Sequence, residues 1–167
     1  MMFAILFAVV VALVTLPVIP AGAQTVSAVT LTNGPPNIPN ASPCTTASCA
    51  WIGAGWPSGT HVSLVYADLT PISADYAGTF SLSDQAGHTG DAAHFSVSTS
   101  SVGYTDSFNN AKSRNFGEIK TNGTVAAGDY FITVTANGAS GSNTQNVTVH
   151  AVSGRRVACA AREGRGD

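Results

Sequence analysis

Apolar side chains alternate with Ser, Thr and Asn along most of this 167-residue chain. The alternation occurs in seven short runs, at 25–31, 61–67, 78–83, 94–98, 117–120, 130–136 and 145–151. Turn residues separate the runs, and no window of eleven or more residues has an apolar stripe at helical spacing. The sequence therefore predicts an all-β fold, an antiparallel β-sandwich of about seven strands with almost no helix.

The run at 130–136 predicts which side of its strand faces the core. In this run the larger set of aliphatic side chains stands at even positions. Because successive side chains of a strand point to opposite faces, Tyr130, Ile132 and Val134 should point inward, and Phe131 and Thr133 outward.

The start of the chain has the pattern of an export signal. Residues 3–19 are almost wholly apolar, and Ala21-Gly22-Ala23 offers the small residues that a signal peptidase accepts. We expect a signal peptide at 1–23 and a mature chain that is secreted, periplasmic or on the cell surface, with no stable membrane span. An uncleaved anchor is the alternative, although an apolar run of this length is at the short limit for roughly 30 Å of hydrocarbon.

A change of composition divides the mature chain. Residues 24–154 carry the alternation and have the size of one domain, whereas 155–167 are rich in Arg, Ala and Gly. We expect the second segment to be a disordered basic tail. The alternatives are an out-of-frame end and an adhesion tripeptide at Arg165-Gly166-Asp167.

Export makes disulfide chemistry relevant to the three cysteines. Cys44 and Cys49 have the spacing to close a small loop, and we predict a bridge between them. Cys159 is then a free thiol in the tail or a site of dimerisation.

Two tryptophans follow this loop. Trp51 and Trp56 lie in "AWIGAGWPSG", where glycines favour a loop or bulged edge over a regular strand. Their odd separation would place them on opposite faces of an extended strand. In one interpretation Trp51 plugs an end of the sandwich while Trp56 covers apolar groups; in the other, Trp56 is exposed as a stacking platform for a sugar.

The charged residues exclude several functions. Residues 24–154 hold Lys112, Arg114 and Lys120 against seven acidic side chains, so there is no basic stripe and we expect no nucleic-acid partner. No catalytic motif accompanies His61, His88, His94 or His150, and we expect neither enzyme activity nor a cofactor. Asp84 and Asp91 would make at best a weak calcium site, so we expect no metal.

The runs after residue 94 resemble the cadherin-like and immunoglobulin-like repeats of secreted bacterial surface proteins. The matching positions are Phe95, Val97, Gly117, Ile119, Thr121, Gly128, Tyr130, Ile132, Val134, Ala136 and 147–149. The resemblance implies an Ig-like or cadherin-like sandwich, but the acidic clusters of calcium-binding cadherin repeats are missing. Because the matching positions are core and turn residues, they indicate fold rather than function.

Two functional hypotheses follow. The first is a non-catalytic module with a structural or adhesion role, whose partner is an extracellular protein or glycan. The alternative is a glycan-binding module that uses Trp51 and Trp56.

Overall fold

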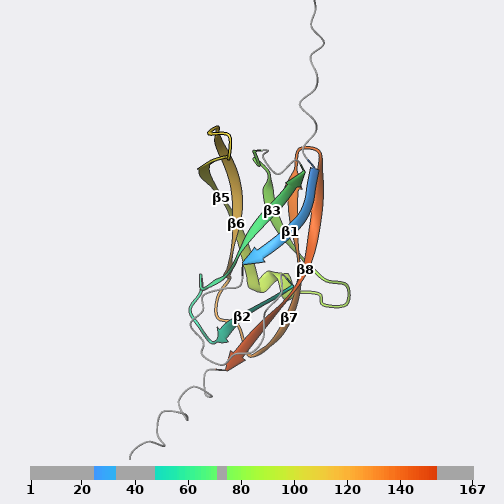
Figure 1. Ribbon diagram of the computed structural model, residues 1–167. Helices are drawn as coiled ribbons and strands as arrows, with labels where there is room; N and C mark the ends of the chain where they lie inside the picture. The colour runs from blue at the N-terminus through green and yellow to red at the C-terminus, as the bar shows by residue number, and fades with distance from the viewer. Residues whose placement is uncertain (1–24, 33–47, 71–74, 154–167) are drawn as a thin grey trace, which may run out of the picture.

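The computed structural model describes residues 25–32, 48–70 and 75–153 (Figure 1). The predicted signal peptide, the basic tail, Cys44 and Cys159 lie outside these ranges. The described chain forms eight strands and one short 3₁₀ helix, η1 (Asp91–His94). The strands are β1 (Thr25–Thr32), β2 (Cys49–Ala54), β3 (His61–Thr70), β4 (Thr79–Asp84), β5 (Phe95–Thr105), β6 (Ala111–Thr121), β7 (Gly128–Gly138) and β8 (Gly141–Ser153).

The strands form two four-stranded sheets. Sheet A has the order β1-β3-β6-β5, and sheet B has the order β2-β8-β7-β4. All neighbours are antiparallel except β2 and β8, which run parallel. The predicted all-β sandwich is confirmed, with eight strands in place of seven.

The eighth strand is β2, in the segment for which the sequence favoured a loop or bulged edge. Its alternation is short and interrupted by Gly53, so local pattern alone does not reveal it. Ala50 and Ile52 are each 1% exposed and belong to the core. Pairing with β8 over six residues therefore overrides the weak strand preference of the glycines.

The core lies between the sheets and consists mainly of β-branched side chains. On β7, Ile132, Val134 and Ala136 are fully buried, while Phe131 and Thr133 are only partly covered. The predicted inward face of this strand is confirmed. Tyr130 is half-buried at the end of the core, where its ring lies 5.7 Å from that of Phe95.

The chain crosses from sheet A to sheet B through residues 75–78. The Tyr76 N–H donates to the Ser113 carbonyl at 3.1 Å, and the Asn115 N–H donates to the Tyr76 carbonyl at 2.7 Å. The Asn115 side chain also donates to the Gly78 carbonyl at 2.9 Å. This connection therefore ties β6 to the start of β4.

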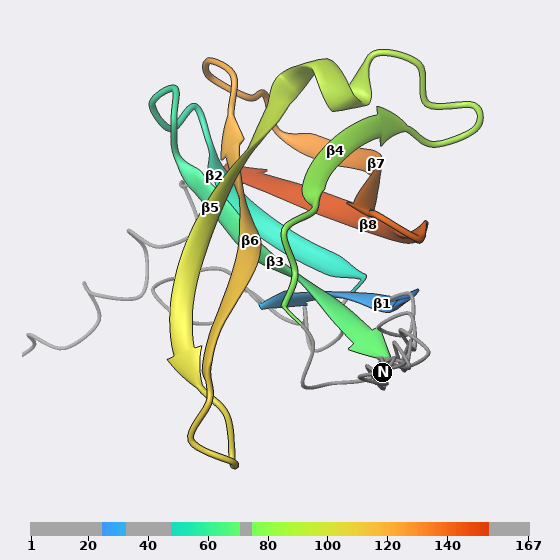
Figure 2. The ribbon, with the colours of Figure 1, turned by 90° about the horizontal axis from the view of Figure 1, so that it is seen from above.

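Strands β5 and β6 are longer than the alternating runs at 94–98 and 117–120 from which they were predicted. Eleven residue pairs join the two strands, and the hairpin extends past the other strands of its sheet (Figure 2). At its tip, the Asp106 carboxylate accepts the N–H groups of Phe108 and Asn110, both at 2.9 Å. This ordered turn leaves the Phe108 side chain 79% exposed.

In the described ranges no helix is long and apolar enough to span a membrane.

Candidate functional site

Trp56 folds back onto the strand that precedes it. Gly55 adopts a left-handed conformation with φ 77°, which reverses the chain directly after β2. The Trp56 N–H donates to the Gly53 carbonyl at 3.3 Å, and the Gly55 N–H donates to the Val125 carbonyl at 2.9 Å. A Cβ atom at Gly53 would lie only 2.1 Å from Cε2 of Trp56, so the indole packs directly on the glycine backbone. The indole side chain remains 39% exposed.

The turn places both indoles on one face of the molecule. Because Ala50 and Ile52 point into the core, Trp51 and Gly53 point to the outer face of sheet B. The odd separation of Trp51 and Trp56 would give opposite faces only if the strand continued, and it ends at Ala54. Trp51 is half-buried and lies outside the core cluster, so it does not plug the sandwich.

Cross-strand register brings polar groups beside the indoles. Trp51 is paired with His150 on β8, which is paired with Asp129 on β7. The His150 Nδ1 and Asp129 Oδ1 atoms are 2.7 Å apart, and their side chains are 36% and 55% exposed. Gly53 is paired with Val152, itself 40% exposed. We call this outer part of sheet B the tryptophan surface; it comprises Trp51, Trp56, Asp129, His150 and Val152.

The chemistry of this surface suits a ligand with both apolar and hydroxyl groups. An indole offers a flat apolar face, on which the C–H groups of a sugar ring can stack. A carboxylate accepts hydrogen bonds and an imidazole both donates and accepts, so Asp129 and His150 can bind hydroxyl groups beside the ring. Sequence reasoning selected the tryptophans but missed Asp129 and His150, because their proximity depends on a parallel pairing that it did not predict.

The start of β2 is held at two points. Cys49 is disulfide-bonded, and the Thr148 N–H of β8 donates to the Ser48 carbonyl at 2.9 Å. Because Cys44 lies outside the described residues, its bridge to Cys49 stays a prediction.

The four histidines lie at separate places and each has its own neighbour. His61 Nδ1 is 3.1 Å from Glu118 Oε1, which lies on the outer face of sheet A. The ring centroid of His88 lies 4.1 Å from that of Phe131, and His94 lies 4.9 Å from Tyr130. Over the ranges that the structure describes, no group of three or more His, Cys, Asp or Glu side chains is placed to hold a metal ion.

Asp84 and Asp91 fix their own loop. The Asp84 carboxylate accepts the N–H groups of Gly90 and Ala92, at 2.8 and 2.7 Å. Asp91 Oδ2 accepts the Phe131 N–H at 2.8 Å. These bonds hold the loop between β4 and β5 against β7, which gives both carboxylates a structural role.

Three carboxylates make stability depend on pH. Backbone hydrogen bonds from Gly90 and Ala92 lower the pKa of Asp84, and those from Asn110 chiefly lower that of Asp106, each from an ordinary 3.8. Hydrogen bonds from Lys120 and His61 lower the pKa of Glu118 from 4.5. A carboxylate whose pKa is lower in the folded than in the unfolded state stabilises the fold at pH values above the unfolded-state pKa. This stabilisation is lost as the pH falls through the folded-state pKa.

We therefore expect the melting temperature to fall as pH drops below 4.5, and to keep falling below 3.8. The variant Asp84→Asn should have a lower melting temperature than the unaltered protein at neutral pH. Its melting temperature should fall less on acidification, because the side chain at position 84 no longer titrates. Calorimetry across pH 2 to 7, spanning these pKa values, measures both curves. Parallel curves for the two proteins would show that Asp84 contributes nothing to the acid response.

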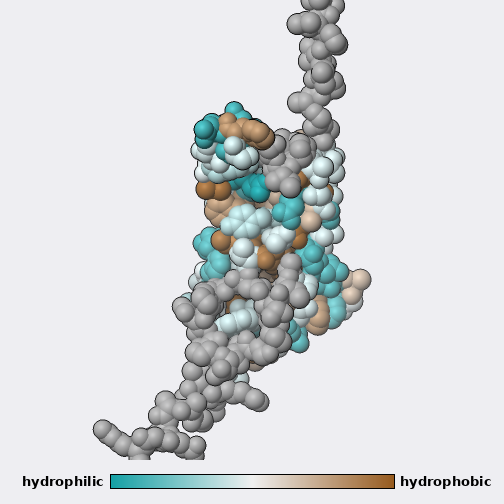
Figure 3. All heavy atoms as spheres, viewed as in Figure 1, coloured by the Kyte–Doolittle hydropathy of each residue, from teal (hydrophilic) through white to brown (hydrophobic). Residues whose placement is uncertain are grey.

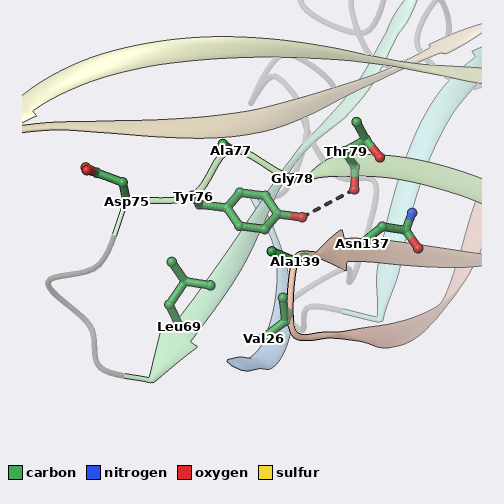
Figure 4. A pocket seen from close by; sticks show the side chains of 10 residues that line it. Val26, Leu69, Asp75, Tyr76, Ala77, Gly78, Thr79, Asn137 and Ala139 are labelled. Atoms are coloured by element: carbon green, nitrogen blue, oxygen red, sulfur yellow. Dashed lines mark hydrogen bonds between the residues drawn. The ribbon is translucent and has the colours of Figure 1, made fainter. Parts of the chain in front are cut away.

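A hollow of about 510 Å³ lies beside the crossing segment (Figure 4). Apolar side chains including Val26 and Leu69 line it, and the Tyr76 hydroxyl is turned to the Thr79 carbonyl at 3.3 Å. Asp75 Oδ1 accepts the Ser113 N–H at 2.8 Å. The Asn137 side chain, which also lines the hollow, donates to the Ser81 hydroxyl at 3.2 Å. The Tyr76, Asp75 and Asn137 side chains are thus already hydrogen-bonded within the protein, and the hollow has no exposed indole, so the tryptophan surface is the stronger candidate.

Comparison of the chain with protein-family models, curated proteins and solved structures finds no match. The functional argument therefore rests on the geometry of the chain itself.

Proposed function

We propose that this chain is a non-catalytic, exported adhesion module that binds carbohydrate through its tryptophan surface. The module is of the Ig-like or cadherin-like type. It works by contact with an extracellular glycan, so this proposal combines the adhesion role with the glycan-binding alternative. A structural role without glycan binding is the remaining candidate.

The strand order supports the type of module. In an immunoglobulin sandwich, strands A, B, E and D form one sheet, and C, F and G form the other. Assigning A, B, D and E to β1, β3, β5 and β6 reproduces the order of sheet A. Assigning C, F and G to β4, β7 and β8 reproduces sheet B, to which β2 is added in parallel beside β8.

The packing of Trp56 on Gly53 is the observation that carries the glycan proposal. An exposed indole on a flexible loop would lose conformational freedom on binding, whereas an indole already held against a strand loses little. The neighbouring Asp129 and His150 supply hydrogen-bonding groups at the side of this platform. A pre-positioned aromatic ring flanked by polar side chains is a typical arrangement for binding the apolar face and the hydroxyls of a sugar together.

Titration with neutral soluble polysaccharides, followed by tryptophan fluorescence and calorimetry, tests the proposal. At least one glycan should bind, and Trp56→Ala should weaken that binding about tenfold or more, since buried tryptophans dominate many interfaces. Gly53→Ala should also weaken it, because the added Cβ displaces the indole while leaving it in the chain.

The matched control is Phe108→Ala, which removes an exposed aromatic ring far along the chain, on the β5–β6 hairpin. This variant should bind as the unaltered protein does. Equal affinities for Trp56→Ala and Phe108→Ala, or no binding to any glycan, would leave only a structural role.

A further inference from the structure

Strand β5 presents a long free edge of sheet A. Its eleven residues pair with β6 one for one, with no shift of register. Among the described residues, the backbone of 96–105 makes no hydrogen bond to a backbone group outside this hairpin. Within the described ranges, the backbone groups of β5 that point away from β6 therefore have no backbone partner. The neighbouring strand β4 reaches β5 through a side chain, because the Phe80 N–H donates to the Thr99 hydroxyl at 3.4 Å.

This edge lacks the features that usually prevent strand addition. Natural edge strands carry charged residues, proline or bulges, or they are short. The β5 sequence "FSVSTSSVGYT" has no charged residue and no proline. By contrast, β1 shifts register between Val26 and Ala28, and β2 and β4 have only six residues each.

We propose that β5 is the dimerisation edge of the protein, and that it pairs antiparallel with β5 of a second copy. The two A sheets then form one continuous eight-stranded sheet across a two-fold axis. Such an interface is self-complementary, because each copy offers the same strand to the other.

The uncharged sequence favours a second copy as the occupant. With Ser100 on the two-fold axis, Val102 lies opposite Ser98 and Thr105 lies opposite Phe95, so no charged side chains meet along the strand pair. The nearest cations of the hairpin, Lys112 and Arg114, lie one strand away on β6.

The same register gives the exposed tip of the hairpin a contact. Chain beyond Thr105 continues past Phe95 of the second copy, toward the aromatic cluster formed by His94, Phe95 and Tyr130. Phe108, the most exposed large apolar side chain described, lies in this part of the tip. In Figure 3, brown atoms at the top of the hairpin mark its apolar surface. Dimerisation would place this surface beside the exposed His94 and the half-buried Tyr130, because the Phe95 ring is already buried.

The oligomeric state in solution tests the proposal. Sedimentation velocity and light scattering, from low micromolar to about 1 mM, should show a dimer that dissociates on dilution. Ser100→Lys places two lysines opposite each other at the axis and should raise the dimer dissociation constant at least about tenfold. Because Ser100 is exposed, this variant should fold normally, which circular dichroism and the melting temperature verify.

Two further measurements make the test specific. Thr32→Lys adds the same charge at the opposite edge of sheet A and should leave the dimer intact. Mixing Ser100→Lys with Ser100→Glu should give mixed dimers that are tighter than those of either variant alone, because opposite charges then meet at the axis.

A monomer throughout the concentration range would overturn the proposal. So would a dimer that Ser100→Lys does not weaken, or mixed variants that fail to associate. None of these outcomes bears on carbohydrate binding, which involves the other sheet.

Discussion

Replacing Gly78 by alanine should destabilise the domain by about 3 kcal/mol, at the upper end of the cost of overpacking. The added Cβ would lie 2.2 Å from the Asn137 backbone oxygen and 2.6 Å from the ring of Tyr76. Asn137 belongs to β7, which is paired on both sides, and Tyr76 is only 3% exposed. Neither neighbour can move without disturbing the crossing between the sheets. Urea denaturation of the two proteins measures the difference in the free energy of unfolding.

The matched control for this change is Gly103→Ala on β5. There the added Cβ meets its nearest heavy atom, the Lys112 carbonyl oxygen, at 3.8 Å, an ordinary contact. We expect a change within about 0.5 kcal/mol. If the two variants had the same stability, the close approach of Gly78 to β7 would be refuted.

Ile132→Ala should cost about 3 to 4 kcal/mol of the free energy of unfolding, because the truncation leaves a cavity in a packed core. Ile132 is 0% exposed and lies on β7, between β8 and β4 in sheet B. Chemical denaturation measures the loss.

Thr135→Ala, on the outer face of the same strand, is the control and should cost less than about 1 kcal/mol. Similar losses at both positions would contradict the assignment of the even positions of β7 to the core.

The alternation that predicts the Ile132 face is the part of the fold most accessible from sequence. Ile132 and Val134 are separated by polar residues on a regular strand, so burial follows directly from the period of two. The same alternation does not predict strand β2. Gly53 and Gly55 weaken the alternation of apolar and polar residues there, and the partner strand β8 lies about a hundred residues further along the chain.

The length of the β5–β6 hairpin could not be predicted from the sequence, for a different reason. Residues 99–105 are mostly Ser, Thr and Gly, a composition that also occurs in loops, so the sequence runs end at Ser98. Pairing with β6 continues to Thr105 because the Asp106 turn closes the hairpin. The length of this arm, and hence its free edge, emerges only from the pairing.

One part of the candidate site could be predicted from local sequence, and the other part depends on the pairing of distant strands. Trp51 and Trp56 stand out in the sequence as large aromatic residues in a glycine-rich stretch, and their possible stacking role could be stated from that alone. Their presence on one face depends on the reversal at Gly55, and their proximity to Asp129 and His150 depends on the register of three strands. Such contacts between distant segments have no local signature.

The most direct test of carbohydrate binding at the tryptophan surface is an NMR titration of the isotope-labelled domain with oligosaccharides of a polysaccharide that it binds. The account predicts that the largest shifts will be those of the Trp51 and Trp56 indole N–H signals and the backbone amides of Asp129, His150 and Val152. Signals on the outer face of sheet A, such as Tyr66 and Phe116, should remain in place. Shifts that cluster on sheet A, or no shift of either indole signal at saturating ligand, would contradict it.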